Sequence, residues 1–426
     1  MTHLNGNDRT VGVSQSKSNV WVSASRDWNA FLSFVGEVLR SIRTSAAPNT
    51  QPVYELPFLA QPFATQQSLG RPFEINLVPP ELIGTGGAGA DQALLDLAEK
   101  WGRGCSFDDI RALSQINFTA RATLDGDILG RLRFDVVGNP DRRIEVSGDR
   151  DPGANVEDWD ELLQVCRNTQ WLKIRFEKGT TLSEGAFYKM HFRDFPFKTW
   201  RWESFLNFDV TKEKPIVGTN KRSFSIADIG LQNSLFCWVQ QNWFGLPLLN
   251  STSGHLICDD GAGEVGDFVH IDTAALDNDL PWVTLIHVKA SSSNAAHRRV
   301  SVTDFEVVCA QAVKNLRALE LSHLTTSLQR SMGNQVAAAS WQNGNHVGSR
   351  TPAMAWAQAH GSNYRRRVVI VQPRMTTTTQ AQMNLQVAQH NQGKYPQIMR
   401  QLNTLLLDTE ASCRSLGAEF LVIGAS

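Results

Sequence analysis

The sequence predicts a chain of the α/β class, α+β overall, with a mixed-sheet core in the C-terminal half and an N-terminal α+β accessory region. Three stretches support this prediction. Residues 117–146 alternate between polar and apolar residues and carry a turn signal at Asp125-Gly126, which is typical of an antiparallel sheet. Residues 255–314 contain three apolar runs and then a helical period, and residues 367–423 read as strand, helix and strand.

Composition divides the chain into regions. A chain of 426 residues is long enough for two or three domains with separate cores. Residues 1–20 are small and polar, which predicts a disordered start. We assign residues 21–215 to the accessory region and residues 222–426 to a C-terminal domain, because the polar stretch Lys212–Arg222 is typical of a linker. Residues 331–362 are rich in Gly, Ala, Ser, Asn and Gln, which predicts a loop insertion.

Periodicity predicts further elements of the accessory region. Apolar residues at helical spacing indicate helices over Asp27–Ile42 and Asn155–Asn168, and Trp171–Lys178 reads as a strand. The glycine cluster Gly84–Ala90 could bind a phosphate on backbone N–H groups, but it lacks the lysine of a P-loop. A flexible loop is therefore the favoured interpretation of this cluster.

The segment Phe187–Phe208 combines nine aromatic residues with basic side chains. Such a combination is typical of a single-strand nucleic-acid platform, in which bases stack on rings and phosphates pair with cations. On that interpretation Lys198, Trp200 and Arg201 contact nucleic acid. The same composition is typical of an aromatic seam between two domains, and the seam is the favoured alternative.

The C-terminal elements have clear boundaries. A strand is predicted over Arg367–Gln372, a helix over Gln397–Leu416 and a final strand over Glu419–Ile423. Gly417 is suited to end the helix. A strand, helix and strand in this order should add parallel strands to the core sheet with a right-handed crossover.

A second basic cluster, with Arg365 and Arg366, precedes the first of these strands. It is either a phosphate contact or a solvated start of the strand, and the latter is favoured. The formal net charge of −1 means that any phosphate-binding surface must be local. The six cysteines are widely scattered, which indicates free thiols in a reducing cytoplasm. No apolar run is long enough for a membrane span, so we expect a cytoplasmic protein without membrane partners.

Polar residues interrupt the apolar runs of residues 255–314. Asp267 lies at the start of the second predicted strand, and His287 and Lys289 lie two apart in the third, on one face. A buried lysine needs an anionic partner, and Asp267 on the neighbouring strand is the expected one. Glu264, just before the second strand, could supply a further carboxylate.

The predicted helix after the third strand carries a polar stripe. Thr303 and Glu306 have the spacing of a capping box, which would start the helix. Asp304, Gln311 and Lys314 then fall on one side of it. One polar edge of the helix is therefore expected to line the same site as the strands.

This pattern resembles the PD-(D/E)XK nuclease superfamily, whose fold is the restriction-endonuclease-like fold. Asp267 matches the aspartate of the second core strand, and Lys289 matches the lysine that closes the (D/E)-x-K motif of the third. Gln311 resembles the helical glutamine of RecB-type nucleases, and Ser225–Phe244 reads as the first helix of the fold. The chain departs from the family at His287, which stands where the acid is expected.

The resemblance implies a Mg²⁺- or Mn²⁺-dependent nuclease acting on DNA, single- or double-stranded. The metal ligands would be Asp267, Glu264 and His287, the catalytic residues Asp267, His287, Lys289 and Gln311, and Lys314 would contact nucleic acid. Histidine is a softer ligand, which favours Mn²⁺. The resemblance also implies a bacterial restriction or anti-phage role beside a helicase-like protein. Two alternatives remain open, a buried polar network and a non-catalytic nucleic-acid-binding or scaffold subunit. A serine hydrolase is set aside because no G-x-S-x-G elbow is present.

Overall fold

The structure, a computed structural model, describes most of the chain from residue 101 onward and shorter pieces before it. The described ranges are 2–4, 7–9, 11–14, 19–22, 27–33, 35–36, 61–62, 69–78, 101, 105–114, 117–124, 126–138, 143–189, 192, 194–215, 229–230, 232–246, 253–260, 264–273, 280–291, 300–319, 323–330, 339–361, 363–391 and 393–426. The predicted glycine cluster at 84–90 lies outside these residues.

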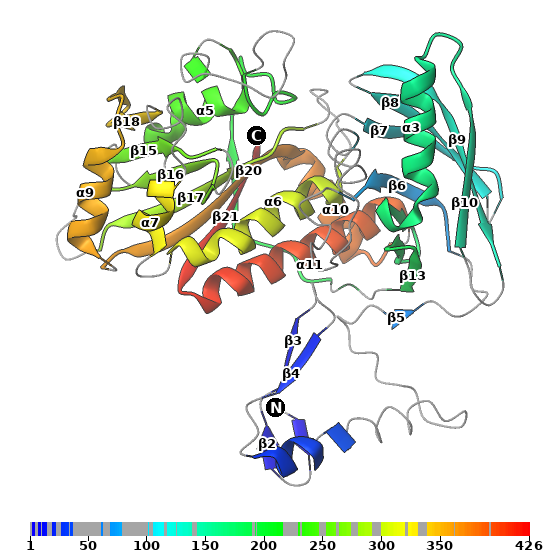
Figure 1. The fold of residues 1–426 in the computed structure, drawn as a ribbon, viewed down its shortest axis with the longest axis horizontal. Helices are drawn as coiled ribbons and strands as arrows, with labels where there is room; N and C mark the ends of the chain where they lie inside the picture. The colour runs from blue at the N-terminus through cyan, green and yellow to red at the C-terminus, as the bar shows by residue number, and fades with distance from the viewer. Residues whose placement is uncertain are drawn as a thin grey trace.

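An eight-stranded mixed sheet forms the framework of the C-terminal half, in the order β14-β21-β20-β17-β16-β15-β18-β19 (Figure 1). Its strands are β14 (Trp200–Glu203), β15 (His255–Cys258), β16 (Phe268–Ile271), β17 (Trp282–Val288), β18 (Ser340–Gln342), β19 (Asn345–His346), β20 (Arg365–Thr376) and β21 (Ala418–Ala425). From β14 to β17 neighbouring strands are parallel, and from β17 to β19 they are antiparallel. The α+β class and the mixed sheet are thus confirmed.

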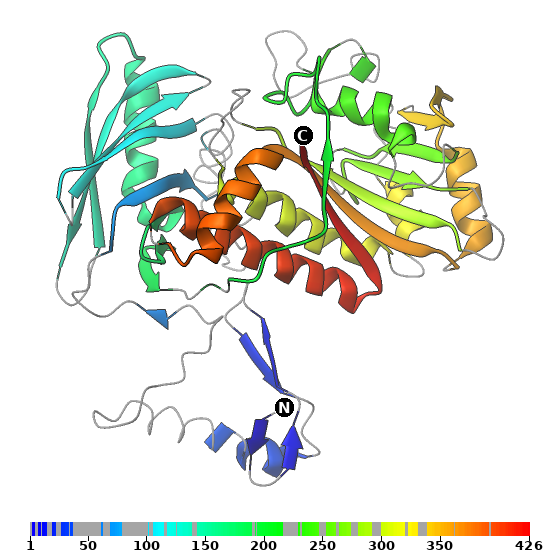
Figure 2. The same ribbon diagram turned by 180° about the vertical axis from the view of Figure 1, so that it is seen from behind.

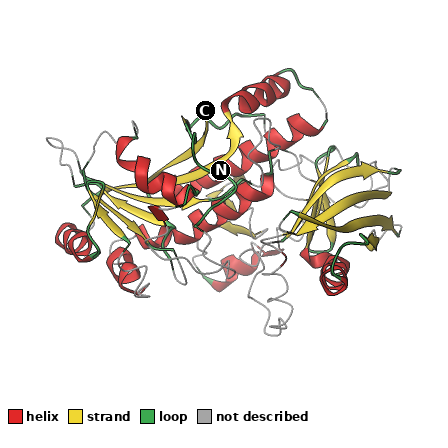
Figure 3. Ribbon diagram, turned by 90° about the horizontal axis from the view of Figure 1, so that it is seen from above, coloured by secondary structure: helices red, strands yellow, loops and turns green. Residues whose placement is uncertain are grey.

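Helices cover both faces of this sheet, as the view from above shows (Figure 3). On one face α5 (Leu235–Asn242) and the short 3-10 helix Trp243–Gly245 pack on even-numbered side chains of β16 and β17, such as Phe268 and Ile286. The helices that contribute to the core on the other face are α6 (Val302–Asn315), α7 (His323–Arg330), α9 (Thr351–His360), α10 (Thr377–Ala388) and α11 (Lys394–Ser415). None of the described helices is long and apolar enough to cross a membrane.

The central parallel strands are apolar on both sides because both of their faces are buried. Val368 to Val371 of β20 are all fully inaccessible, as are Val422 and Ile423 of β21. The predicted strand, helix and strand correspond to β20, α11 and β21, and β20 and β21 are parallel as expected. Gly417 adopts φ +69° after α11, in the left-handed region that favours glycine at a helix end. The additional helix α10, between β20 and α11, was not predicted.

In the described part of the accessory region, two antiparallel sheets and a helix pack around a shared core. The four-stranded sheet, order β10-β9-β8-β7, consists of β7 (Cys105–Ala112), β8 (Asn117–Leu124), β9 (Asp127–Val137) and β10 (Arg143–Arg150). The five-stranded sheet, order β5-β13-β12-β11-β6, consists of β5 (Gln61–Pro62), β6 (Pro72–Leu77), β11 (Leu172–Phe176), β12 (Thr180–Ser183) and β13 (Ala186–Lys189). The predicted acidic helix is α3 (Val156–Arg167), whose first amides are capped by the Asn155 side chain.

The structure differs from the sequence prediction at the start of the chain. Two small antiparallel pairs stand where residues 1–20 were expected to be disordered, and alternating Val residues give the second pair its strand character. Their strands are β1 (Thr2–Leu4), β2 (Asn7–Arg9), β3 (Val11–Ser14) and β4 (Asn19–Val22). Of the helix predicted over 27–42, residues 28–33 and 35–36 are described as helical.

The predicted insertion at 331–362 is more regular than a loop. Its described part holds the β18–β19 hairpin, which extends the sheet beside β15, and the helix α9. The hairpin turns at Asn343 and Gly344, with φ values of 49° and 81°. An Asn-Gly pair with both φ values positive is the favoured two-residue hairpin turn, so this signal was present in the sequence.

The predicted domain boundary also differs from the arrangement of the strands. β14, which lies within the predicted accessory region 21–215, pairs in parallel with β21 along the edge of the C-terminal sheet (Figure 2). Residues 209–213 then pack on α5, because the carbonyls of Lys212 and Glu213 accept hydrogen bonds from the amides of Leu235 and Phe236. Residues 200–215 therefore belong structurally with the C-terminal sheet.

Candidate metal centre

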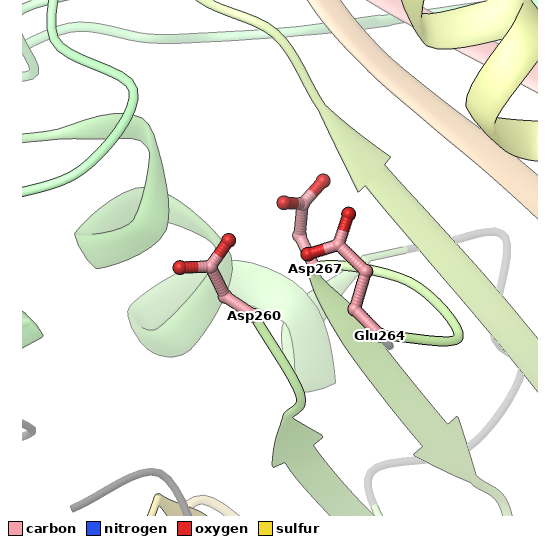
Figure 4. Close-up of side chains that lie close together, drawn as sticks. All are labelled: Asp260, Glu264 and Asp267. Atoms are coloured by element: carbon pink, nitrogen blue, oxygen red, sulfur yellow. The ribbon is translucent and has the colours of Figure 1, made fainter. Parts of the chain in front are cut away.

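Three carboxylates converge at the turn between β15 and β16 (Figure 4). Asp260, Glu264 and Asp267 each offer an oxygen atom, and these atoms all lie within 4.8 Å of one another. Asp260 lies two residues after β15 and Asp267 directly before β16, so the antiparallel pairing of the two strands brings them together. Asp260 and Asp267 are buried, and Glu264 is half-buried. We call these three residues the acidic cluster.

Asp267 is held by one hydrogen bond to its side chain and one to its main-chain carbonyl. Its Oδ2 accepts a hydrogen bond from the amide of Val288 at 2.7 Å, and its carbonyl accepts one from the amide of Asp259 at 3.0 Å. Burial, and then the nearby Glu264 carboxylate, raise the pKa of Asp267 well above its usual value. Keeping this carboxylate ionised is therefore unfavourable without a compensating cation.

Asp259, the neighbour of Asp260, has a structural role. Its Oδ1 pairs with Nη1 of Arg350 at 2.8 Å, and its Oδ2 accepts from the amide of Val265. Both members of the pair are buried, and Arg350 also donates to the carbonyls of Cys258 and Leu328. This network fixes the turn that carries the acidic cluster.

Two lysines and one glutamate adjoin the acidic cluster. The ammonium group of Lys214 contacts Oδ1 of Asp260 and lies 5.6 Å from the centroid of the Phe236 ring. Lys289, directly after β17, was expected to pair with Asp267, but its Nζ lies 3.3 Å from Oε2 of Glu213. Glu213 is the link between the two lysines, because its Oε1 lies 3.9 Å from Nζ of Lys214.

His287 lies beneath the turn that carries Glu264 and Asp267. It is fully inaccessible, and a Cβ atom placed on Gly266 would lie 3.6 Å from Cε1 of its ring. Neither ring nitrogen has a hydrogen-bond partner among the described residues, and burial lowers the pKa of His287 to about 4. His287 is not one of the three residues whose ligand atoms converge in the acidic cluster.

The start of α6 differs from the predicted capping box. Ser301 is the N-cap, and its Oγ accepts from the amide of Asp304. Thr303 and Glu306 instead bind Arg175 of β11, at 2.6 Å in each case. Ser301 can cap because it retains an extended backbone, whereas Thr303 is already inside the helix.

The polar stripe of α6 meets the site only at its first turn. Asp304 pairs with Arg374 at 2.9 Å, and Lys289 is among the charges that influence its pKa. Gln311 is half-buried seven residues further along the helix, which corresponds to about 10 Å. Lys314 is exposed in the last turn, still further from Asp304.

The prediction that Trp200 stacks on bases is wrong, because Trp200 belongs to the core of the C-terminal sheet. Trp200 is buried, its ring stacked on Trp202 at 5.1 Å and set edge-on to Phe197 and Phe305. A ring enclosed on these sides cannot accept a base. Lys198 and Arg201, predicted beside it as nucleic-acid contacts, are exposed.

The basic cluster at the start of β20 lies far from the acidic cluster. Arg365 pairs in register with Trp282, at the opposite end of β17 from Lys289. Seven residues of strand correspond to about 23 Å. Arg365 is exposed near the ring of Trp282, and Arg366 donates to the carbonyl of Leu416 at 2.9 Å. These arginines are therefore not placed to contact a group bound at the acidic cluster.

Sequence reasoning missed Asp260, Glu213 and Lys214. Asp260 was interpreted as part of a turn, although two acidic residues directly after an apolar strand were a usable signal. Lys214 is 46 positions from its partner Asp260 and lies in a stretch interpreted as linker. No periodic pattern indicates such a long-range contact.

The site is thus defined by its own geometry. The strands β15 and β16, which flank the cluster, follow α5 in the chain and are followed by β17 and α6. The elements α7, β18, β19 and α9 then precede β20, which is parallel to β17. Comparisons of the chain with models of protein families, with curated proteins and with solved structures found no match.

Proposed function

We propose that this chain is a metal-dependent nuclease that hydrolyses phosphodiester bonds of DNA, with Asp260, Glu264 and Asp267 as ligands of Mg²⁺ or Mn²⁺. The observation that carries the proposal is the convergence of three carboxylate oxygens within 4.8 Å, two of the three residues being buried. Like charges at this distance repel one another, so a cation is needed if all three are to be ionised.

The donor set fits such an ion. Mg²⁺ and Mn²⁺ prefer oxygen ligands, and every atom of the acidic cluster that could bind is a carboxylate oxygen. Among the described residues, Glu213, Lys214 and Lys289 adjoin the three carboxylates.

The proposal also rests on the resemblance to the PD-(D/E)XK superfamily, in which an acid lies on the second core strand and a lysine on the third. Asp267 lies directly before β16, and Lys289 lies directly after β17. By the same resemblance we propose DNA as substrate, a helicase-like protein as partner, and a role in bacterial restriction or anti-phage defence.

The residues of the chain have distinct parts in the proposed reaction. When bound, a divalent cation supplies charge neutralisation at the scissile phosphate and a more acidic water. The Val288 amide orients the Asp267 carboxylate. Lys214 and Lys289 place positive charge beside the cluster, where a phosphodiester anion would bind. His287 fills the space under Gly266, and its low pKa keeps the ring neutral near pH 7.

The test is incubation of plasmid and single-stranded DNA with the purified chain in Mg²⁺, Mn²⁺ or EDTA. We expect cleavage that needs the metal, and Glu264→Gln and Asp267→Asn should each reduce it by at least about 100-fold, because each removes a ligand charge. Glu145→Gln, on the exposed surface of β10, is the matched control and should cleave like wild type. Equal cleavage by the cluster variants and the control would refute the proposal.

A second candidate is a non-catalytic nucleic-acid-binding or scaffold subunit. It is favoured by His287 in place of the family's acid, and by the contact of Lys289 with Glu213 where the family would have it face a metal ligand. Metal-independent DNA binding without cleavage by wild type would support this candidate.

A further inference from the structure

Lys214 is fixed in place by its own segment and by α5. The carbonyl of Glu213, the preceding residue, accepts the amide of Phe236 in the first turn of α5 at 3.0 Å. The Lys214 ammonium lies over the ring of the same Phe236. The side chain is therefore held at both ends, and its charge is directed to Asp260.

The cations near the site are divided among different acids. Arg350 pairs with Asp259, Arg374 with Asp304 and Lys289 with Glu213. Lys214, in contrast, pairs with Asp260, which is a member of the acidic cluster itself. The Lys214 side chain is also about one-third exposed, at 36%, so it lies at the edge of the core and not within it.

We propose that Lys214 is the resident counter-cation of the acidic cluster and the first phosphate contact of the substrate. In the metal-free protein its ammonium neutralises Asp260. A divalent cation on the same carboxylates would compete with the ammonium, because both are cations at one acid. The released ammonium then pairs with a non-bridging oxygen of the phosphodiester anion, and no bond or proton is exchanged in this step. This inference rests on the proposed function and names the residue that recognises the phosphate.

Three variants isolate the charge of Lys214. Lys214→Met keeps an unbranched stem that can pack on Phe236 but removes the charge, and Lys214→Arg keeps the charge. Lys212→Met is the matched control, because Lys212 lies two residues away and pairs with Asp209, outside the cluster. Circular dichroism establishes that each variant is folded.

Mn²⁺ binding, measured by electron paramagnetic resonance in the absence of DNA, tests the first half of the proposal. We expect Lys214→Met to bind Mn²⁺ about tenfold more tightly than wild type, because a competing positive charge has been removed. Lys212→Met and Lys214→Arg should stay near wild type. Unchanged or weaker Mn²⁺ binding by folded Lys214→Met would overturn the role as counter-cation.

Single-turnover cleavage at saturating Mn²⁺ tests the second half. Lys214→Met should cleave on the order of 100-fold more slowly than wild type, with partial recovery in Lys214→Arg. Cleavage by Lys214→Met at the wild-type rate would overturn the phosphate contact alone. A wild-type chain that bound no Mn²⁺ would instead refute the proposed function and this inference with it, so the two failures are distinguishable.

Discussion

Asp259 and Asp260 are neighbours in the chain with opposite surroundings. Asp259 is paired with the buried Arg350, whereas Asp260 belongs to the acidic cluster. Asp259→Asn should lower the free energy of unfolding by about 3–5 kcal/mol, because it leaves a buried arginine without its charge partner. Asp260→Asn should change stability by less than about 1 kcal/mol while weakening Mn²⁺ binding. Urea denaturation measures the free energy of unfolding of both variants. An equal loss of stability in Asp259→Asn and Asp260→Asn would contradict the prediction.

Asp267 is expected to destabilise the metal-free protein. Burial and the Glu264 carboxylate raise its pKa, so the unfavourable contribution is absent below the unfolded pKa and grows as the pH rises through the folded value. Asp267→Asn can still accept the Val288 amide. The variant should therefore be more stable than wild type at pH 8 in EDTA, by about 1 kcal/mol.

That advantage should vanish as the pH falls below the usual range of aspartate. Thermal melts at a series of pH values check this prediction. If the melting temperatures of Asp267→Asn and wild type differed by the same amount at every pH, the pKa of Asp267 would not be raised in the folded protein. His287 stays neutral over most of this range because its pKa is lowered to about 4.

The candidate site could be predicted only in part from the sequence. Asp267 and Glu264 were found because strand alternation and a short turn are local signals. Asp260 was within reach of the same reasoning. Lys214 was not, because its contact with Asp260 depends on how the segment after β14 packs on α5. Trp200 was misplaced for a related reason, since composition alone does not distinguish a buried ring from an exposed one.

Among the secondary-structure elements, β14 shows how an edge strand depends on its aromatic residues. Trp200 contacts Phe197, Trp202 and Phe305 in the core beneath α6. Trp200→Ala should lower the free energy of unfolding by about 3–5 kcal/mol, because a large buried ring leaves a cavity. Arg201→Ala, on the exposed side of the same strand, is the control and should be nearly neutral. Loss of DNA affinity without loss of stability in Trp200→Ala would restore the base-stacking interpretation.

The helix α6 begins at a carboxylate that comes from another sheet. Glu74 of β6 accepts hydrogen bonds from Ser301 Oγ and from the amides of Val302 and Thr303, and pairs with Arg175. Glu74→Ala should therefore destabilise the first turn of α6, by about 1–3 kcal/mol for buried groups left unpaired. Faster hydrogen exchange of the Thr303 amide, with unchanged exchange in α11, is the expected measurement. Equal acceleration in both helices would indicate general unfolding instead.

At the scale of the whole molecule, the pairing of the strands predicts which C-terminal fragment of the chain is the more stable. Residues 222–426 lack β14 and Lys214, whereas residues 194–426 retain both. The longer fragment should be folded with the higher melting temperature, because it completes the sheet edge beside β21. Both fragments should melt below the full chain, since both lose Glu74 and Arg175. Equal melting temperatures of the two fragments would instead support the domain boundary predicted from the polar stretch Lys212–Arg222.

Most of the fold was predictable because long apolar runs and helical periods are local features. The boundary between the two parts was not, because Lys212 and Glu213, which composition assigns to a linker, are hydrogen-bonded to α5. The hairpin of the insertion was also overlooked, although its Asn343-Gly344 turn was visible in the sequence.

The capping of α6 by Glu74 also bears on the order in which the chain is made. β6 and β11 precede α6 by more than a hundred residues, so they leave the ribosome first. When α6 emerges, the carboxylate that receives its first amides can already be held against Arg175. The Glu74 carboxylate is thus synthesised before the helix that it caps. In a circular permutant that begins with α6, the helix would be synthesised before Glu74.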